Sequence, residues 1–201
     1  MTEARKRVTL TEDEVIDAAL SIIESDGLAA LSMRRMAREL GRSQMAAYWY
    51  VDDKDELIDL VVRRILSRVE IPQNSSGPWR ERLRSVIVSL DELVRTYPSL
   101  SAVLLSRMLT VDQHIVEAIM EILQDAGFDE REITMAYAMV HTYMFGRYQV
   151  VTDRPQSQPV EGLSPLLIRV TAELPRLHGL DYFEFGIDVL LDGLAARLPS
   201  R

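Results

Sequence analysis

Four arginines stand close together in a chain that is acidic overall. The 201 residues carry a net charge of −8, but residues 28–50 contain one acid and four arginines: Arg34, Arg35, Arg38 and Arg42. Arginine presents a planar fork of N–H donors that suits phosphate oxygens. Because salt screens charges beyond about 10 Å, the local balance matters more than the net charge. The cluster is therefore suited to bind a polyanion. Further basic residues near the start would form either a basic arm beside that polyanion or a solvated tail: Arg5, Lys6 and Arg7.

The elements that must position these arginines are two short helices joined at a glycine. Ser32 is placed as the N-cap of the first helix, which would end at Gly41, and Ser43 is placed to cap a second that runs to about Tyr50. The small side chain of Ala37 suits the point where the helices touch, and Gly41 suits a turn with positive φ. This spacing is typical of a helix-turn-helix, although an ordinary helical corner has the same pattern.

Helical spacing recurs along the rest of the chain. A capping box of Thr11 and Glu14 opens the first helix, Gly27 ends it, and Asp53 with Glu56 opens a helix that runs to about residue 70. The stretch 72–78 is the clearest linker, and 153–162 is a second polar break. We expect the remaining helices at 78–96, 99–108, 111–126, 130–151, 165–175 and 182–197, with cap pairs Thr110/Gln113, Asp129/Glu132 and Asp181/Glu184. The expected fold class is all-α.

The composition excludes several classes of protein. The chain has no cysteine, so it has neither a disulfide framework nor a thiolate metal site, in agreement with a reducing cytoplasm. No apolar run approaches the roughly 20 residues that a membrane helix needs, and the first residues lead into no signal-peptide core. We therefore expect a cytoplasmic protein that is not inserted in a membrane.

Two stretches of sequence resemble the tetracycline-repressor (TetR) family. Residues 27–41 resemble the second helix of its DNA-binding domain, and residues 48–57 resemble the end of its recognition helix and the start of the next helix, which is the more specific mark. Residues 93–105, 128–153 and 183–193 are similar to the regulatory domain of the tetracycline-repressor branch. The resemblance implies a three-helix helix-turn-helix domain at 1–55, a connecting helix at 56–71, and a ligand-binding and dimerisation domain at 72–201.

The family resemblance also assigns roles toward double-stranded DNA. It places five residues on or near the phosphate backbone: Arg34, Ser43, Tyr48, Tyr50 and Lys54. Four others are the expected contacts to base edges: Gln44, Met45, Ala46 and Trp49. Gln44 has the amide to bond adenine, and Met45 or Ala46 has the apolar surface to contact a thymine methyl group. Gln44 and Ala46 also fit plain surface positions, and Arg34 has donors that could reach a guanine.

Three positions depart from the family pattern. Arg42 stands where valine is usual, Ala47 where leucine is frequent, and Tyr50 where histidine is common. Arg42 loses a core contact and adds a charge at the start of the recognition helix. We expect it either to contact a DNA phosphate or to be a solvated surface arginine.

One short recognition helix contacts too few bases for useful specificity, so we expect a homodimer on a palindromic operator. The resemblance places the interface on the helices at 130–151 and 182–197, packed with their symmetry mates as a four-helix bundle. The predicted contacts are Ala136, Met139, Val140, Tyr143, Phe185, Val189, Leu190 and Leu194.

A ligand pocket is the other implied site. Pockets are mostly apolar with a few convergent polar groups, and the candidates are Trp79, Leu83, Tyr97, Leu104, Met108, Ile119, Leu123, Tyr137, His141 and Tyr148. Each of them also suits a plain hydrophobic core. Three histidines, His114, His141 and His178, show no metal-site pattern, so we expect no metal, no other cofactor and a small apolar or amphipathic inducer. By resemblance, the inducer would shift the helix at 99–108 and through it the helix at 54–70.

The sequence therefore predicts a ligand-responsive transcriptional regulator, with repression the commoner mode in the family. An enzyme is the first alternative, but the chain has no glycine-rich phosphate loop, no His-Glu-x-x-His motif and no cysteine nucleophile. A helical adaptor is the second alternative. It would not need Tyr48, Trp49 and Lys54 in that order.

Overall fold

The computed structural model describes residues 10–43, 45, 48–73, 77–152, 163–173, 176 and 179–198, without the side chains of 149–152. These residues form helices and no strands, which confirms the all-α class. Two compact units divide the chain: residues 1–69 with 92–113, and residues 70–91 with 114–201. The first unit thus includes residues 92–113, which the sequence-based division assigns to the regulatory domain. None of the helices in the described part of the chain is long and apolar enough to cross a membrane.

Helix α1 (Glu12–Asp26) forms as its capping box predicts. The Thr11 hydroxyl accepts a hydrogen bond from the Glu14 N–H at 3.2 Å, and the Glu14 carboxylate accepts one from the Thr11 N–H at 2.8 Å. The chain leaves the helix at Gly27, whose φ of 79° suits glycine. The expected apolar stripe is buried: Val15, Ala19, Ile22 and Ile23. A 3-10 turn follows at Leu28–Ala30.

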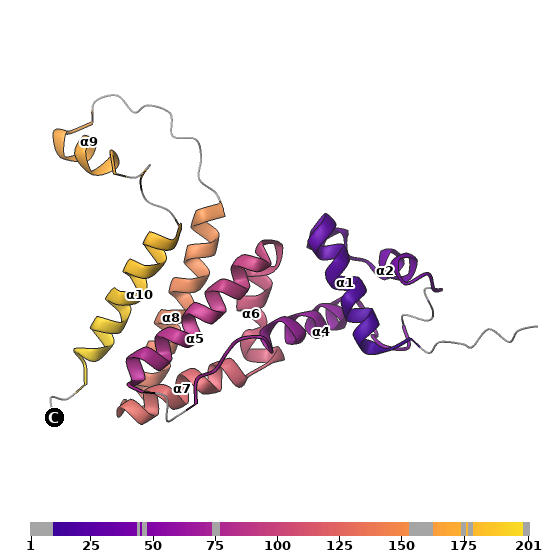
Figure 1. Cartoon of the computed structure of the whole chain (residues 1–201), viewed down its shortest axis with the longest axis horizontal. Helices are drawn as coiled ribbons and strands as arrows, with labels where there is room; N and C mark the ends of the chain where they lie inside the picture. Colours follow the sequence, from indigo (N-terminus) through magenta and orange to yellow (C-terminus); the bar gives the residue numbers. More distant parts are fainter. Residues whose placement is uncertain are drawn as a thin grey trace, which may run out of the picture. The chain divides into compact units, whose positions relative to one another are not determined.

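Helix α2 (Met33–Glu39) begins with the predicted cap, since the Ser32 hydroxyl accepts from the Arg35 N–H at 3.2 Å. Ala37 is buried, and Gly41 has a φ of 60°. In the predicted second short helix, 44–50, the residues Gln44, Ala46 and Ala47 lie outside the described residues, as do the basic residues before position 10. Helix α1 packs against both α2 and α4 (Lys54–Leu66) (Figure 1).

The rest of the first unit packs on α4. After the C-terminal turns of α5 (Trp79–Thr96) come a 3-10 turn at Pro98–Leu100 and α6 (Ser101–Val111). The α6 side chains Leu104, Leu105 and Met108 are buried, as are Leu57, Val61 and Ile65 of α4, and α4 and α6 are in contact. The expectation that Thr110 caps the next helix is wrong, because α6 continues through it and its hydroxyl donates to the Arg107 carbonyl at 3.2 Å.

The second unit is built from α5 up to residue 91, α7 (His114–Ala126), α8 (Glu130–Thr152), α9 (Pro165–Thr171) and α10 (Gly179–Ala195). Helices α8 and α10 run antiparallel and side by side (Figure 1). The Asp129 cap forms as predicted and accepts from the Glu132 N–H at 2.8 Å. The prediction that Asp181 caps the last helix is wrong, because α10 begins at Gly179 and Asp181 lies in its first turn.

Gly186 marks the closest approach of α8 and α10. The Tyr143 hydroxyl donates toward the carbonyls of Tyr182 and Phe183, at 2.9 and 3.1 Å, and its ring lies over Gly186. A Cβ at Gly186 would overlap the Tyr143 hydroxyl and lie 2.5 Å from the nearest ring carbons. Only glycine fits here without moving the tyrosine.

We expect Gly186→Ala to lower the free energy of unfolding by about 1–2 kcal/mol, because overpacking outweighs the better helix propensity of alanine. Gly146→Ala in α8 is the matched control, since its added Cβ has no neighbour within 4 Å. That variant should gain up to about 1 kcal/mol. Urea unfolding of both proteins checks this, and similar midpoint shifts in the two would contradict the steric argument.

Candidate functional site

The predicted DNA-binding residues that the structure describes gather on the helix-turn-helix part of the first unit. Arg34 in α2 is exposed, as are Arg42 and Ser43 in the turn after it, and Lys54 is the first residue of α4. Gln44 and Ala46 lie outside the described residues. The phosphate contact of Arg42 stays a prediction.

Large apolar side chains project from the same region. Trp49 is 85% exposed, Met45 70% and Tyr48 41%. Exposed aromatic and methionine side chains on one surface usually mark a binding site, since they gain free energy only when a partner covers them. Val51, directly after them, is 2% exposed and anchors the segment in the core. The segment that follows the exposed arginines in sequence thus presents exposed apolar and aromatic groups.

Tyr50, an expected phosphate contact, and Arg35, a member of the arginine cluster, each bind a group of this same chain. Tyr50 is half-buried, and its hydroxyl donates to the main-chain carbonyl of Leu10, just before α1. The hydrogen that a phosphate contact would use is therefore engaged within the chain. Arg35 pairs with Asp26 at 2.9 Å and with Glu39 at 3.9 Å, so within the arginine cluster it stabilises α2 against the end of α1.

Arg107 is a neighbour of this site that the sequence did not indicate. It lies on α6, and its guanidinium donates to both the main-chain carbonyl and the carboxylate of Asp55, each at 3.2 Å, and pairs with Asp59. Asp55 follows Lys54 directly, so a cation of α6 is held at the start of α4. No local pattern could have found it, because the partners are about 50 residues apart in sequence.

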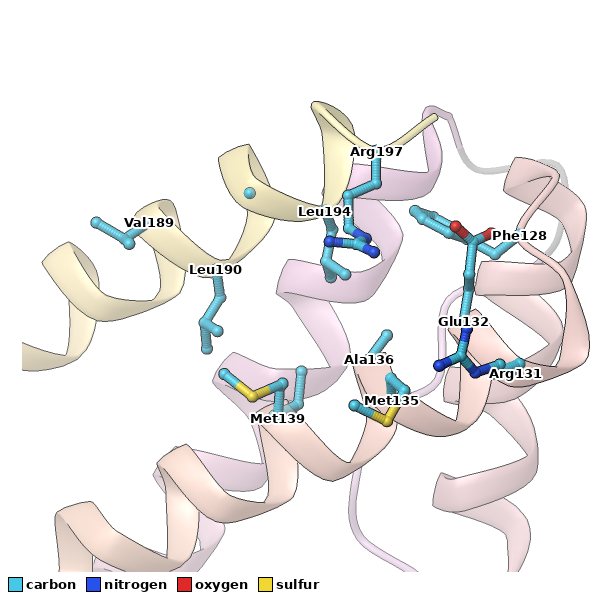
Figure 2. A pocket seen from close by; sticks show the side chains of 12 residues that line it. Phe128, Arg131, Glu132, Met135, Ala136, Met139, Val189, Leu190, Leu194 and Arg197 are labelled. Carbon is cyan, nitrogen blue, oxygen red and sulfur yellow. The ribbon is translucent and has the colours of Figure 1, made fainter. Parts of the chain in front are cut away.

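A groove of about 420 Å³ lies between α8 and α10 in the second unit. Figure 2 shows Leu190 and Leu194 of α10 directed toward Met139 and Ala136 of α8. Six predicted dimer contacts line the groove: Ala136, Met139, Val140, Val189, Leu190 and Leu194. The lining residues that sequence reasoning missed are Phe128, Arg131, Glu132, Met135, Gly193 and Arg197.

The groove belongs to an apolar face that the single chain leaves uncovered. On α8, Met135 is 60% exposed and Met139 is 54% exposed. On α10, Val189 is 54% exposed and Phe185 is 74% exposed. Of the predicted contacts, Tyr143 differs, because its hydroxyl is bonded to α10 of its own chain. Monomers rarely expose a continuous apolar surface of this kind, and charged groups at its edge, such as Arg131 and Arg197, resemble the polar rim of a protein interface.

The predicted ligand-pocket residues fall in both units. Tyr97, Leu104 and Met108 belong to the first, and the other seven belong to the second. Most are core residues of their own unit: Leu83, Leu104, Met108, Ile119 and Leu123 are at most 2% exposed. Tyr97 is buried, and its hydroxyl accepts from Arg68 at 2.7 Å. Contact of these residues with a ligand stays a prediction.

The aromatic candidates of the second unit are half-buried rather than enclosed. Trp79 packs edge-on against Phe128, with ring centroids 5.6 Å apart. Tyr137 and His141 lie one helical turn apart on α8, with centroids 5.8 Å apart, and burial raises the pKa of Tyr137. His178 lies outside the described residues. Within the part of the chain that is described, no three histidine or carboxylate side chains are grouped to hold a metal ion.

Tyr148 belongs to a buried polar network. Its hydroxyl donates to the Asp91 carboxylate at 2.7 Å, and Arg147 binds the same carboxylate through Nε at 3.1 Å and Nη2 at 3.0 Å. The remaining guanidinium nitrogen of Arg147, Nη1, donates to the carbonyl of Gly179 at 2.8 Å. The side chains of Asp91 and Arg147 are 1% and 7% exposed. This ion pair joins α5, α8 and the start of α10, and the sequence analysis missed it.

Residues 15–61 match the family model described as bacterial regulatory proteins, tetR family, and residues 71–198 match the tetracyclin repressor-like C-terminal domain. The HTH-type transcriptional repressor DrrR1 of Streptomyces coeruleorubidus is 31% identical over 96% of this chain and 80% of its own length. ActR of Streptomyces coelicolor, solved in complex with actinorhodin, is 26% identical, with a TM-score of 0.79 over 94% of this chain and 97% of ActR. BioQ, known from Mycobacterium smegmatis and solved with its double-stranded DNA operator, is 27% identical, with a TM-score of 0.68 over 94% of this chain and 99% of BioQ.

Proposed function

Because the chain belongs to the tetR family of bacterial regulatory proteins, we propose that it represses transcription as a homodimer that binds a palindromic DNA operator and is released by a small apolar or amphipathic inducer. It is a ligand-responsive, DNA-binding regulator, and its place of action is the cytoplasm. The named relative DrrR1 is a repressor, which supports repression over activation. We propose no catalytic activity.

The observation that carries the DNA-binding part is the exposed group Met45, Tyr48 and Trp49 beside the arginines of α2. Basic side chains supply the phosphate attraction that positions a protein on DNA, and apolar or amide groups contact the base edges. The net charge of −8 opposes non-specific binding to DNA, so binding would depend on a locally basic surface such as this one. BioQ, solved on its operator, provides the precedent.

Dimerisation is supported by the uncovered face of α8 and α10. A second copy would cover Met139 and Val189 with the same apolar patch of its own surface, as a two-fold interface requires. Two recognition segments would then contact two half-sites, which accounts for the expected palindrome. The inducer part is supported by ActR, which was solved with actinorhodin bound.

Selection from a random pool of duplex DNA tests the function, and we expect a palindromic sequence to be enriched. Lys54→Ala and Tyr48→Ala should each weaken binding to that sequence by about 10-fold, and Lys54→Ala should reduce the salt slope of log K by about 1. Arg80→Ala is the matched control, because Arg80 pairs with Asp192 in the second unit and should leave the affinity unchanged. If folded protein enriches no sequence, the DNA-binding proposal is wrong.

A further inference from the structure

The first two turns of α4 carry a dense group of charges. Lys54, the expected phosphate contact, is followed directly by Asp55 and one turn later by Asp59. The Asp55 side chain is 79% exposed and that of Asp59 is 40% exposed. Asp55 is adjacent to Lys54, and Asp59 is five residues after Lys54, about 7.5 Å along the helix axis. Because charges act over about 10 Å at ordinary salt, each carboxylate would repel a phosphate that Lys54 attracts.

Arg107 of α6 offsets part of the negative charge of these two carboxylates. Its guanidinium is 3.2 Å from the carboxylate of Asp55 and is paired with that of Asp59. The Arg107 side chain is itself 27% exposed. The hydrogen bond to Asp59 raises the pKa of Arg107, so the positive charge is permanent. The net charge beside Lys54 therefore depends on a residue of another helix.

The position of that charge is determined by how α6 packs on α4. Leu104 and Met108 are buried on α6, and farther along α4 the Arg63 Nε donates to the Val111 carbonyl at 3.4 Å. Arg107 therefore reaches Asp55 and Asp59 from a neighbouring helix that is packed on α4.

We propose that Arg107 offsets part of the negative charge of Asp55 and Asp59 at the DNA-binding end of α4, and that this residue of α6 thereby raises the affinity of the first unit for phosphate. The inference rests on the proposed DNA-binding function and adds a charge-based route by which α6 would act. With Arg107 in place, one of these two negative charges is offset, so Lys54 attracts phosphate against a weaker opposing charge. With Arg107 withdrawn, two carboxylates oppose it.

The test is the affinity of the full chain for duplex DNA, measured by fluorescence anisotropy between 50 and 300 mM salt. We expect Arg107→Gln to weaken binding by about 10-fold at low salt and by about 2-fold or less at high salt, because salt screens the unmasked carboxylates. Arg107→Lys, which keeps the charge, should retain most of the affinity. The triple variant Arg107→Gln/Asp55→Asn/Asp59→Asn should bind at least as tightly as the wild type, because no charge is left to mask.

Arg84→Gln is the matched control, since Arg84 also bridges two acids, Glu184 and Asp188, in the second unit. It changes the net charge equally and should leave DNA affinity unchanged. If the wild type binds DNA and Arg107→Gln binds it equally well, the proposed function stands but this inference is wrong. A triple variant that stays weak would overturn it too, because the role of Arg107 would then be packing. If the wild type binds no DNA, the proposed function fails and the inference fails with it.

Discussion

Arg147→Met is expected to lower the free energy of unfolding by about 3–5 kcal/mol, because it leaves the buried carboxylate of Asp91 without its charge partner. The Asp91 side chain is 1% exposed, so water cannot replace the guanidinium. Methionine is apolar and flexible and replaces the aliphatic part of the arginine side chain, so the loss should come from the orphaned charge more than from a cavity. The Tyr148 hydroxyl still donates to Asp91, which holds the carboxylate in place.

The double variant Arg147→Met/Asp91→Leu separates the cost of the orphaned charge from the value of the pair. Replacing both members of a buried ion pair with apolar residues is often close to neutral, so we expect the double variant to recover most of the loss. Arg84→Met is the control for a surface pair, with Arg84 33% exposed, and should cost about 1 kcal/mol or less. Urea or thermal unfolding measures all three. If Arg147→Met is no less stable than Arg84→Met, the orphaned-charge argument is wrong.

Met139→Glu and Val189→Glu are expected to convert the proposed dimer into folded monomers and to weaken operator binding by about 100-fold or more. Each side chain is 54% exposed in the single chain, so glutamate is tolerated in the isolated fold. In the dimer it would bury an unpaired carboxylate in an apolar interface, which costs several kcal/mol. A monomer engages one half-site and loses the gain of binding two together.

Sedimentation velocity at micromolar concentration, with circular dichroism to verify folding, checks the prediction. Leu109→Glu is the matched control, because Leu109 is an apolar side chain of α6 that is 50% exposed and lies in the other unit. It should sediment as the wild type does. A wild type that is monomeric would refute the homodimer, and dimeric Met139→Glu and Val189→Glu variants would place the interface elsewhere.

Local signals in the sequence predicted the helix starts well. The caps at Thr11, Ser32, Asp53 and Asp129 all form as predicted, because an N-cap hydrogen bond joins residues three apart and depends little on the rest of the fold. Asp181 has the same spacing to Glu184 but does not cap its helix. There the helix begins two residues earlier, at Gly179, whose carbonyl accepts a hydrogen bond from Arg147.

The ends of helices and the polar contacts of the core were less predictable. Helix α4 stops at Leu66 instead of about residue 70, and the N–H of Glu70 donates to the Ser89 hydroxyl at 2.9 Å. No glycine or proline marks that stop. The contacts of Tyr50 with Leu10, Arg107 with Asp59 and Arg147 with Asp91 join residues 40, 48 and 56 positions apart. Periodicity reports which face of a helix is apolar, but it does not report which charged residue of another helix will lie opposite.

The two tryptophans of the chain stand one in each unit. Trp49 is 85% exposed among the candidate DNA contacts, whereas Trp79 packs its edge against Phe128. Each unit therefore carries its own intrinsic fluorophore, the first in a watery environment with red-shifted emission and the second in a more apolar one with blue-shifted emission. Quenching of the red component follows DNA binding, and a red shift of the blue component follows loss of packing in the second unit. A Trp49→Phe variant isolates the second signal, so events in the two halves of the chain can be timed separately without any attached label.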